Sequence, residues 1–287
     1  MNTNDCWKAF ADRIGSPFWR PHIREEPLKG IVLAGGLGTR LYPITKITNK
    51  HLMPVYNKPM VFYPIQTLVD AGVSEILVVT GGNNAGDFLR LLRNGEEFGL
   101  KQLSYRYQEG EGGIAAALSL AETFAGDDSI CVILGDNIYE NSLKQSAEEF
   151  ARIGKGARIH LKQVENAQRF GVPVMQDGRI LRIDEKPKNP QTNFAVTGFY
   201  MYDSSVFQII KTLKPSGRGE LEITDVNNAY IERNEMSWQV IEGWWSDAGT
   251  FDSLLRANIL VASQHKGNEE ELPQEVIQTS ASILRRQ

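Results

Sequence analysis

An apolar stretch that runs directly into a cluster of glycines constrains the fold of this chain more than any other feature. Residues 30–34 form an uninterrupted apolar run, typical of a parallel strand buried on both faces. Three glycines follow within four positions, at Gly35, Gly36 and Gly38. Glycine permits positive φ angles and lets backbone N–H groups approach an anion closely. The pattern predicts a phosphate-binding turn after a strand.

The residues after these glycines suit phosphate oxygens. Thr39 supplies a hydroxyl donor, Arg40 a planar set of donors, and Lys50 a compact positive charge. Two other phosphate-binding loops do not fit, because the P-loop needs a Gly-Lys pair and the GxGxxG pattern needs a glycine where Leu41 stands. We expect a loop for a nucleotide's pyrophosphate; the alternative is a plain strand-to-helix turn with solvated charges.

Composition narrows the class of protein. The 287 residues, 41% of them hydrophobic, can bury a core as one large α/β domain or as a core with appendages. A net charge of −4 without any Lys/Arg-rich block predicts no nucleic-acid partner. No stretch approaches the roughly 20 apolar residues of a membrane span, and residues 1–15 lack an apolar export signal. Two cysteines, Cys6 and Cys131, are too few for a disulfide framework, so we expect a cytoplasmic protein.

Short apolar runs alternate with amphipathic stretches, which indicates βαβ units and a doubly wound, mainly parallel sheet. The predicted strands cover residues 30–34, 75–81, 103–108, 129–137, 157–164, 170–187, 194–203 and 238–243. The predicted helices cover residues 59–72, 85–93, 113–124, 204–213, 222–234 and 251–265. The second half is richer in β structure, with a hairpin turn expected at Asp177-Gly178.

The chain divides into an N-terminal extension (residues 1–28), one main domain (29–265) and a C-terminal tail (266–287). Four aromatic residues predict that the extension packs on the domain or on a neighbouring subunit; a disordered tag is the alternative. They are Trp7, Phe10, Phe18 and Trp19. The tail is polar at first, and its end fits one short helix.

Two aspartates stand where strands are predicted to end. Asp136 follows the apolar run 130–134, and Asp247 lies beside a turn glycine. Ligands of open α/β sheets bind beyond the carboxyl ends of the strands, where the glycine loop also lies. Magnesium is typically held by one or two carboxylates together with substrate phosphates. We therefore interpret Asp136 and Asp247 as magnesium ligands; an ordinary capping aspartate is the alternative for Asp136.

A third group, Glu185, Lys186 and Pro187, closes another predicted strand. The lysine ammonium suits a second phosphate, and the glutamate can accept hydrogen bonds from hydroxyl groups. This combination suits a phosphorylated sugar. A solvated surface ion pair before a turn is the alternative.

Together these motifs resemble the glucose-1-phosphate thymidylyltransferases of the sugar nucleotidyltransferase family. The resemblance spans residues 29–262 and is carried by GGLGTRLYPITKITNKHLMPVYNKPM, LGDNIY, EKP, FAVTGFYMYD, GELEITDVN and WWSDAGT. It implies a Rossmann-like sheet with an inserted β-rich sugar-binding part. It also implies that dTTP and glucose 1-phosphate condense to dTDP-glucose, a precursor of rhamnose and other deoxysugars, and pyrophosphate. A homo-oligomer, either a tetramer or a dimer, is implied as well.

The resemblance also implies roles for individual residues. The nucleotide-binding residues would be Leu33, Gly35, Gly36, Gly38, Thr39, Arg40, Gln108, Gly113 and Asp136, with Gln108 reading the pyrimidine. The sugar-binding residues would be Gly171, Glu185, Lys186, Val196 and Trp245. Arg40, Lys50 and Lys186 would be catalytic, because they neutralise charge while a sugar-phosphate oxygen attacks the α-phosphorus. Mg²⁺ would be the cofactor, on Asp136 and Asp247. No histidine is required, although His51 beside Lys50 is placed to line the site; the other three look structural or solvated.

Some features depart from the long form of this family. Residues 109–112 replace a proline-containing turn, Pro173 is expected to break a strand, and the region after Asp247 is shorter. The resemblance therefore does not predict product feedback at a separate site.

Two alternative functions stay open. One is the same chemistry with UTP or another hexose 1-phosphate, since a single methyl group is worth only about 1–3 kcal/mol in an apolar pocket. The other is a non-catalytic regulatory subunit that binds sugar nucleotides. The presence of Arg40, Lys50, Asp136 and Asp247 speaks against it.

Overall fold

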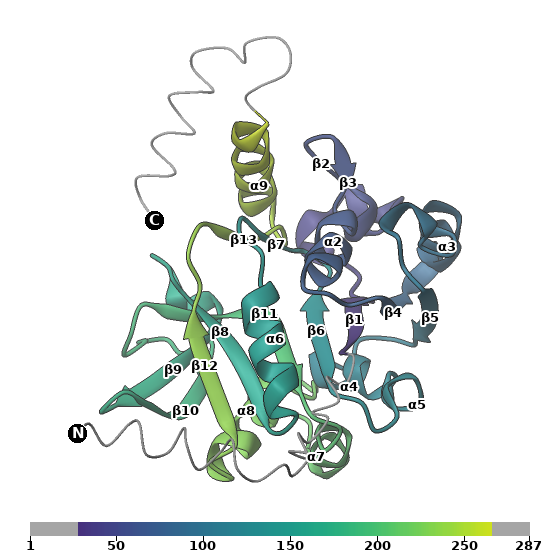
Figure 1. Ribbon diagram of the computed structural model, residues 1–287. Helices are drawn as coiled ribbons and strands as arrows, with labels where there is room; N and C mark the ends of the chain where they lie inside the picture. The colour runs from purple at the N-terminus through teal and green to yellow at the C-terminus, as the bar shows by residue number, and fades with distance from the viewer. Residues whose placement is uncertain (1–27, 266–287) are drawn as a thin grey trace, which may run out of the picture.

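The computed structural model describes residues 28–265 and builds them around a seven-stranded sheet (Figure 1). Its strands are β1 (Lys29–Ala34), β4 (Glu75–Gly81), β5 (Gln102–Gln108), β6 (Ile130–Leu134), β8 (Ala157–Gln163), β11 (Phe194–Tyr202) and β12 (Met236–Val240). They lie in the order β12-β8-β11-β6-β1-β4-β5. The four strands β6, β1, β4 and β5 are parallel, whereas β11 runs antiparallel to both β6 and β8. Strands β8 and β12 are parallel to each other as well, so β11 alone runs against the other six strands of this sheet. The predicted α/β class with a mainly parallel sheet is confirmed.

Helices cover both faces of this sheet. They are α2 (Phe62–Asp70), α3 (Ala85–Leu92), α4 (Ile114–Ser119), α5 (Glu122–Ala125), α6 (Lys144–Ile153), α7 (Val206–Thr212), α8 (Ile223–Glu232) and α9 (Phe251–Gln264). One apolar cluster joins the sheet to α2, α3 and α6, and a second joins the opposite face to α4, α5, α7 and α8. Strand β1 contributes Val32 to the first cluster and Ile31 to the second, which explains its unbroken apolar sequence.

The β-rich part contains a separate hairpin of β9 (Gly171–Gln176) and β10 (Arg179–Glu185). Its turn is the predicted Asp177-Gly178, with φ angles of 49° and 75°. The expectation that Pro173 breaks a strand is wrong, because Pro173 lies within β9 and pairs with Ile183. A two-stranded sheet has two free edges, where a missing N–H donor is tolerated.

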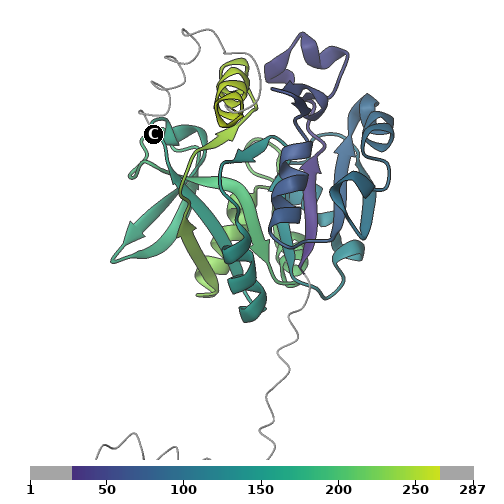
Figure 2. The ribbon, with the colours of Figure 1, turned by 45° about the horizontal axis from the view of Figure 1, so that its top comes forward.

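A third apolar cluster connects α9 to two small sheets (Figures 1 and 2). One sheet pairs β7 (Asn137–Tyr139) with β13 (Trp245–Asp247), and the other pairs β2 (Pro54–Val55) with β3 (Lys58–Pro59). A capping box of Thr250 and Ser253 begins α9 directly after β13. Helix α9 thereby fixes the end of β13, where Asp247 lies.

Short 3₁₀ helices lie in some of the connections between these elements. They are η1 (Thr39–Leu41), η2 (Ile44–Lys46), η3 (Lys50–Leu52), η4 (Gly82–Asn84), η5 (Glu96–Phe98) and η6 (Ala167–Arg169).

Several predicted boundaries need correction. The helix expected over 59–72 begins only at Phe62, because Lys58 and Pro59 pair in β3. The helix expected over 113–124 divides in two, since the backbone changes to i→i−3 hydrogen bonds at Leu120 and Ala121. The strand expected over 129–137 ends at Leu134, and α6 was not predicted.

Some predictions lie outside the described residues: those on the extension up to residue 27, including Cys6 and His22, and those on the tail 266–287. Cys131 is a free, buried cysteine within β6. Over residues 28–265, none of the helices has the length and apolarity that a membrane crossing requires.

Candidate functional site

The glycine loop and Gln108 meet at the carboxyl edge of the parallel strands. The loop follows β1, and Gln108 is the last residue of β5. A methyl group built on Gly35 would lie 2.2 Å from Gln108 Oε1, so the amide side chain lies against the start of the loop. A methyl group on Gly36 would meet no atom within 4 Å, so the loop is open at this residue.

The loop turns back so that Lys50 lies beside it. Gly38 adopts a left-handed conformation, with φ 66° and ψ 34°, immediately before η1. Its carbonyl accepts a hydrogen bond of 2.8 Å from the Thr45 hydroxyl. A methyl group on Gly38 would lie 3.2 Å from Lys50 Cβ. Buried Leu41 anchors the end of the turn in the third apolar cluster.

Lys50 and Asp136 form a largely buried ion pair. Lys50 Nζ lies 2.5 Å from Asp136 Oδ2, and the two side chains are 13% and 12% exposed. Asp136 Oδ1 accepts a further hydrogen bond from the Asn137 amide, at 2.9 Å. Burial by itself would raise the pKa of Asp136, but the neighbouring Lys50 ammonium and these hydrogen bonds hold it well below its usual range. Asp136 is therefore ionised at neutral pH.

Asp136, Asp247 and Arg40 converge on Gly249. A methyl group built on Gly249 would lie 3.4 Å from Asp136 Oδ2, 3.5 Å from Arg40 Nη2 and 3.7 Å from Asp247 Oδ2. Asp136 lies in the turn between β6 and β7, Arg40 in η1 and Asp247 at the end of β13, and they meet because β13 pairs with β7 directly after Asp136. Two carboxylates and one guanidinium thus surround a small space that is free because Gly249 has no side chain.

Asp247 is held by an arginine that the sequence interpretation did not include. Arg169 Nη2 donates to Asp247 Oδ2 at 3.0 Å. The pKa of Asp247 is raised to about 6, mainly by burial; the Arg169 guanidinium lowers it, nearby Asp136 raises it and Arg40 lowers it. Asp247 is consequently the more easily protonated of the two carboxylates.

This donor set fits a divalent cation that also binds phosphate. The carboxylates of Asp136 and Asp247 supply hard oxygen ligands on one side of the space at Gly249. Among residues 28–265, no three Asp, Glu, His or Cys side chains gather as a complete metal cage. A sparse carboxylate pair is the arrangement in which substrate phosphates complete the coordination of magnesium.

Two of the predicted sugar residues, Gly171 and Lys186, lie beside Glu185. Glu185 pairs with Gly171 across the hairpin, and its carboxylate accepts a hydrogen bond of 2.6 Å from Thr224. Lys186 Nζ and Arg218 Nη2 each lie 3.3 Å from Glu185 Oε1. Two cations beside a carboxylate suit a ligand with both a phosphate and hydroxyl groups.

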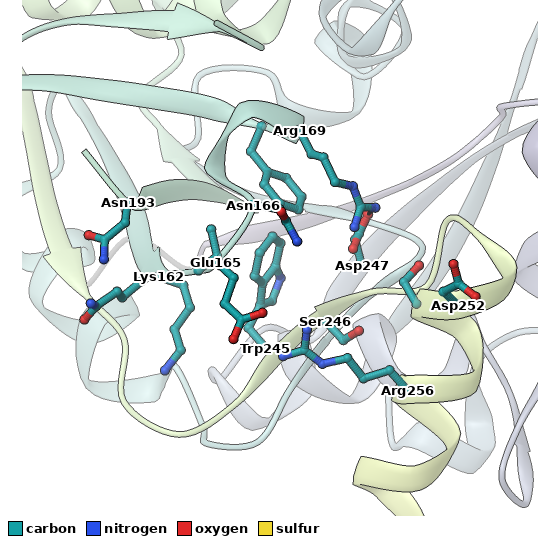
Figure 3. A pocket seen from close by; sticks show the side chains of 14 residues that line it. Lys162, Glu165, Asn166, Arg169, Asn193, Trp245, Ser246, Asp247, Asp252 and Arg256 are labelled. Carbon is teal, nitrogen blue, oxygen red and sulfur yellow. Dashed lines mark hydrogen bonds and ion pairs between the residues drawn. The ribbon is translucent and has the colours of Figure 1, made fainter. Parts of the chain in front are cut away.

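Trp245 lies two residues before Asp247 and lines a cavity together with it. Its Nε1 donates to Asn137 Oδ1 at 2.7 Å, and its ring packs against Phe170 with centroids 5.1 Å apart. Both rings line a cavity of about 350 Å³, at one end of which Arg169 and Asp247 point toward each other (Figure 3).

Three other predicted residues have structural roles in the described fold. Leu33 and Val196 belong to the apolar core, at 7% and 8% exposure. Gly113 has a φ of 91°, and a methyl group on it would lie 2.6 Å from the Leu221 carbonyl oxygen, so the backbone itself requires glycine there. Their proposed contacts with ligands stay predictions.

His51 is buried against Gly135, with Nδ1 2.8 Å from Asn49 Oδ1. Burial, and then Lys50, lower the pKa of His51 to about 3. The ring is therefore neutral at physiological pH. His160 is also fully buried, hydrogen-bonded to Ser146, and has a structural role.

The sequence interpretation missed several residues that contact this site. They include Arg169 on Asp247, Asn137 on Asp136, Arg218 and Thr224 on Glu185, and Glu111, whose carboxylate accepts the Leu37 N–H of the glycine loop at 3.3 Å. Two of them carried a local signal: Arg218 lies between two glycines, and Asn137 directly follows Asp136.

Comparison with known proteins gives consistent matches. Residues 29–264 match the family model described as nucleotidyl transferase. A glucose-1-phosphate thymidylyltransferase from Neisseria meningitidis is 45% identical over 80% of this chain and 81% of its own length. One from Mycobacterium tuberculosis is 42% identical over 87% of this chain and 88% of its own length.

Solved structures agree with these matches. A Bacillus anthracis protein assigned as a glucose-1-phosphate thymidylyltransferase, in complex with sucrose, superimposes with a TM-score of 0.79. It is 48% identical, and the match covers 85% of this chain and 98% of that one. A UDP-glucose pyrophosphorylase complexed with UDP-glucose, 24% identical, shares the fold with a TM-score of 0.73 over 83% of this chain and all of its own.

Proposed function

Because the chain belongs to the nucleotidyl transferase family, we propose that it condenses dTTP with glucose 1-phosphate to give dTDP-glucose and pyrophosphate. The observation that carries this proposal is the meeting of Arg40, Asp136 and Asp247 at Gly249, beside an open glycine loop. The names of the relatives supply the substrates, and the geometry supports the type of chemistry.

The reaction is an in-line displacement. An oxygen of the sugar phosphate forms a bond to the α-phosphorus, the bond from that phosphorus to the bridging oxygen breaks, and pyrophosphate leaves with the electron pair. The sugar phosphate is already ionised, so no general base is needed. Catalysis then depends on positioning and on neutralising charge.

Each group of residues has a role in this scheme. The loop N–H groups at Gly35, Gly36 and Gly38 bind the triphosphate, with Thr39 and Arg40 at its end. Gln108 and Gly113 receive the base. In the free protein the Lys50 ammonium lies 2.5 Å from the Asp136 carboxylate. When the nucleotide enters, Lys50 leaves Asp136 and binds phosphate, because the polyanion attracts it more strongly than a single carboxylate does.

Asp136 and Asp247 would hold Mg²⁺, which when bound neutralises phosphate charge and orients the reacting groups. Sugar hydroxyls bind between Gly171, Glu185, Val196 and Trp245, and the Lys186 ammonium binds the sugar phosphate. A cytoplasmic homo-oligomer, either a dimer or a tetramer, is part of the proposal; light scattering determines the oligomer size.

Pyrophosphate release tests the reaction. We would pair dTTP, UTP, CTP, ATP and GTP with glucose 1-phosphate, and then with other sugar 1-phosphates, in the presence of magnesium. Fastest release with dTTP and glucose 1-phosphate supports the proposal. Preference for another pair keeps the mechanism and changes the substrate, whereas no release with any pair refutes catalysis and favours a non-catalytic binding subunit.

A further inference from the structure

Each of the two proposed metal carboxylates already has a cationic partner in the free protein. Lys50 pairs with Asp136 at 2.5 Å, and Arg169 pairs with Asp247 at 3.0 Å. Arg40 is the third cation, beside the same space at Gly249. The carboxylates are therefore electrically balanced before any metal or substrate arrives.

Arg169 reaches Asp247 from the sugar-binding half of the protein. It ends η6, directly before Phe170 and β9, and is 78 positions from its partner in the chain. Its guanidinium lies over the Phe170 ring, 5.3 Å from the centroid. The Arg169 side chain is 40% exposed and lines the cavity of about 350 Å³ (Figure 3). Arg169 thus has room to leave Asp247 without any change in the packed core.

We propose that Arg169 takes the place of the divalent ion on Asp247 in the free enzyme and competes with that ion for the carboxylate. The inference rests on the proposed function, because it takes Asp247 as a metal ligand. An N–H donor and a metal ion both use the lone pairs of the Asp247 carboxylate oxygens. The Arg169 guanidinium and a divalent ion on this one carboxylate would also repel each other. Arg169 therefore sets the affinity of the site for the ion.

Binding of Mn²⁺ to the full chain without nucleotide tests this competition. Mn²⁺ is the probe because its free concentration is measured directly by electron paramagnetic resonance. Arg169→Gln keeps much of the side-chain volume and removes the charge. We expect it to bind Mn²⁺ about two- to fivefold more tightly than the unaltered protein, the range that corresponds to one partly exposed ion pair.

The matched control is Arg182→Gln. Arg182 also pairs with an aspartate, Asp184, at 2.8 Å, but it lies on β10, away from Gly249. Its removal should leave Mn²⁺ binding unchanged. A merely structural role for Arg169 would weaken metal binding or leave it unaltered on substitution, so tighter binding is specific to competition. Circular dichroism checks the fold of each variant, and Arg169→Met repeats the test if Arg169→Gln does not fold.

Asp247→Asn separates this inference from the function on which it rests. If Asp247→Asn binds Mn²⁺ as well as the unaltered protein does, the metal assignment itself fails. If Asp247→Asn loses affinity while the folded Arg169 variant binds no more tightly than the unaltered protein, only the proposal for Arg169 is overturned. Tighter binding by the Arg169 variant with weaker binding by Asp247→Asn supports both.

Discussion

Asn137 holds Asp136 and Trp245 in place, and its replacement by alanine should destabilise the whole protein. The side chain is 2% exposed and makes three hydrogen bonds. Its Oδ1 accepts from Gly198 N–H at 2.9 Å and from Trp245 Nε1–H at 2.7 Å, and its amide donates to Asp136 Oδ1 at 2.9 Å. One amide thereby links β11, β13 and the end of β6.

The expected loss in the free energy of unfolding follows from the hydrogen-bond donors that lose their acceptor. Asn137→Ala leaves two buried donors, on Gly198 and Trp245, without a partner, and each such group costs about 1–3 kcal/mol. The free energy of unfolding should therefore fall by roughly 2–6 kcal/mol, a large share of the ~5–15 kcal/mol that stabilises a typical protein. The lost bond to Asp136 adds to this, because that acceptor is charged.

Urea denaturation followed by circular dichroism measures the effect, with Asn258→Ala as the control. Asn258 also makes two hydrogen bonds, accepting from Tyr56 N–H at 2.7 Å and donating to the Leu254 carbonyl at 2.8 Å, but water reaches this region. Its replacement should cost less than about 1 kcal/mol. A loss for Asn137→Ala that equals the loss for Asn258→Ala would refute the reasoning.

Three further predictions concern ligands and the glycine positions. Burial raises the pKa of Asp247 to about 6, so Asp247 takes up a proton as the pH falls through 6. Below pH 6 the affinity for Mn²⁺ should therefore decrease by up to about tenfold for each pH unit, and above pH 7 it should be constant; a flat profile from pH 5 to 8 would contradict this. Gly36→Ala should keep its thermal midpoint, because a methyl group there meets nothing within 4 Å, but should lose nucleotide affinity, because that methyl group would stand in the proposed phosphate loop. Gly113→Ala should lose about 1–3 kcal/mol of stability, because alanine is strained at a φ of 91°. Lys186→Ala should raise KM for glucose 1-phosphate and keep dTTP affinity; an unchanged KM would remove Lys186 from the sugar-phosphate site.

The sequence predicted the central sheet because its signal is local. The strand over 30–34 is apolar on every residue, since both of its faces are buried, and glycines mark the turn that follows. The parallel strands β4 and β5, which end at residues 81 and 108, are likewise short and are each preceded by a helix. These patterns were sufficient for the fold class and for the positions of the glycine loop after β1 and of Asp136 after β6.

Contacts between distant segments were beyond such patterns. Asp247 is beside Asp136 because two three-residue strands, β7 and β13, pair across more than a hundred positions, and neither is long enough to show periodicity. Arg169 and Arg218 are single cations, and the site carboxylates that they contact, Asp247 and Glu185, lie 78 and 33 positions away in sequence. Helix α6 was missed although its buried side, Ser146, Ala147 and Phe150, follows helical spacing, because the small and polar members weaken the apolar signal.

The central claim is that Asp136 and Asp247 form one site for nucleotidyl transfer. Pyrophosphate release from dTTP and glucose 1-phosphate, measured for Asp136→Asn and Asp247→Asn beside Asp184→Asn as the control, tests it most directly. Asp184 pairs with Arg182 on the hairpin of β9 and β10 and is not among the side chains that meet at Gly249. We expect both site variants to keep their fold and lose at least about a hundredfold in rate, the scale of a lost group that stabilises transition-state charge, while the control stays active. Near-normal rates for the two site variants would contradict it.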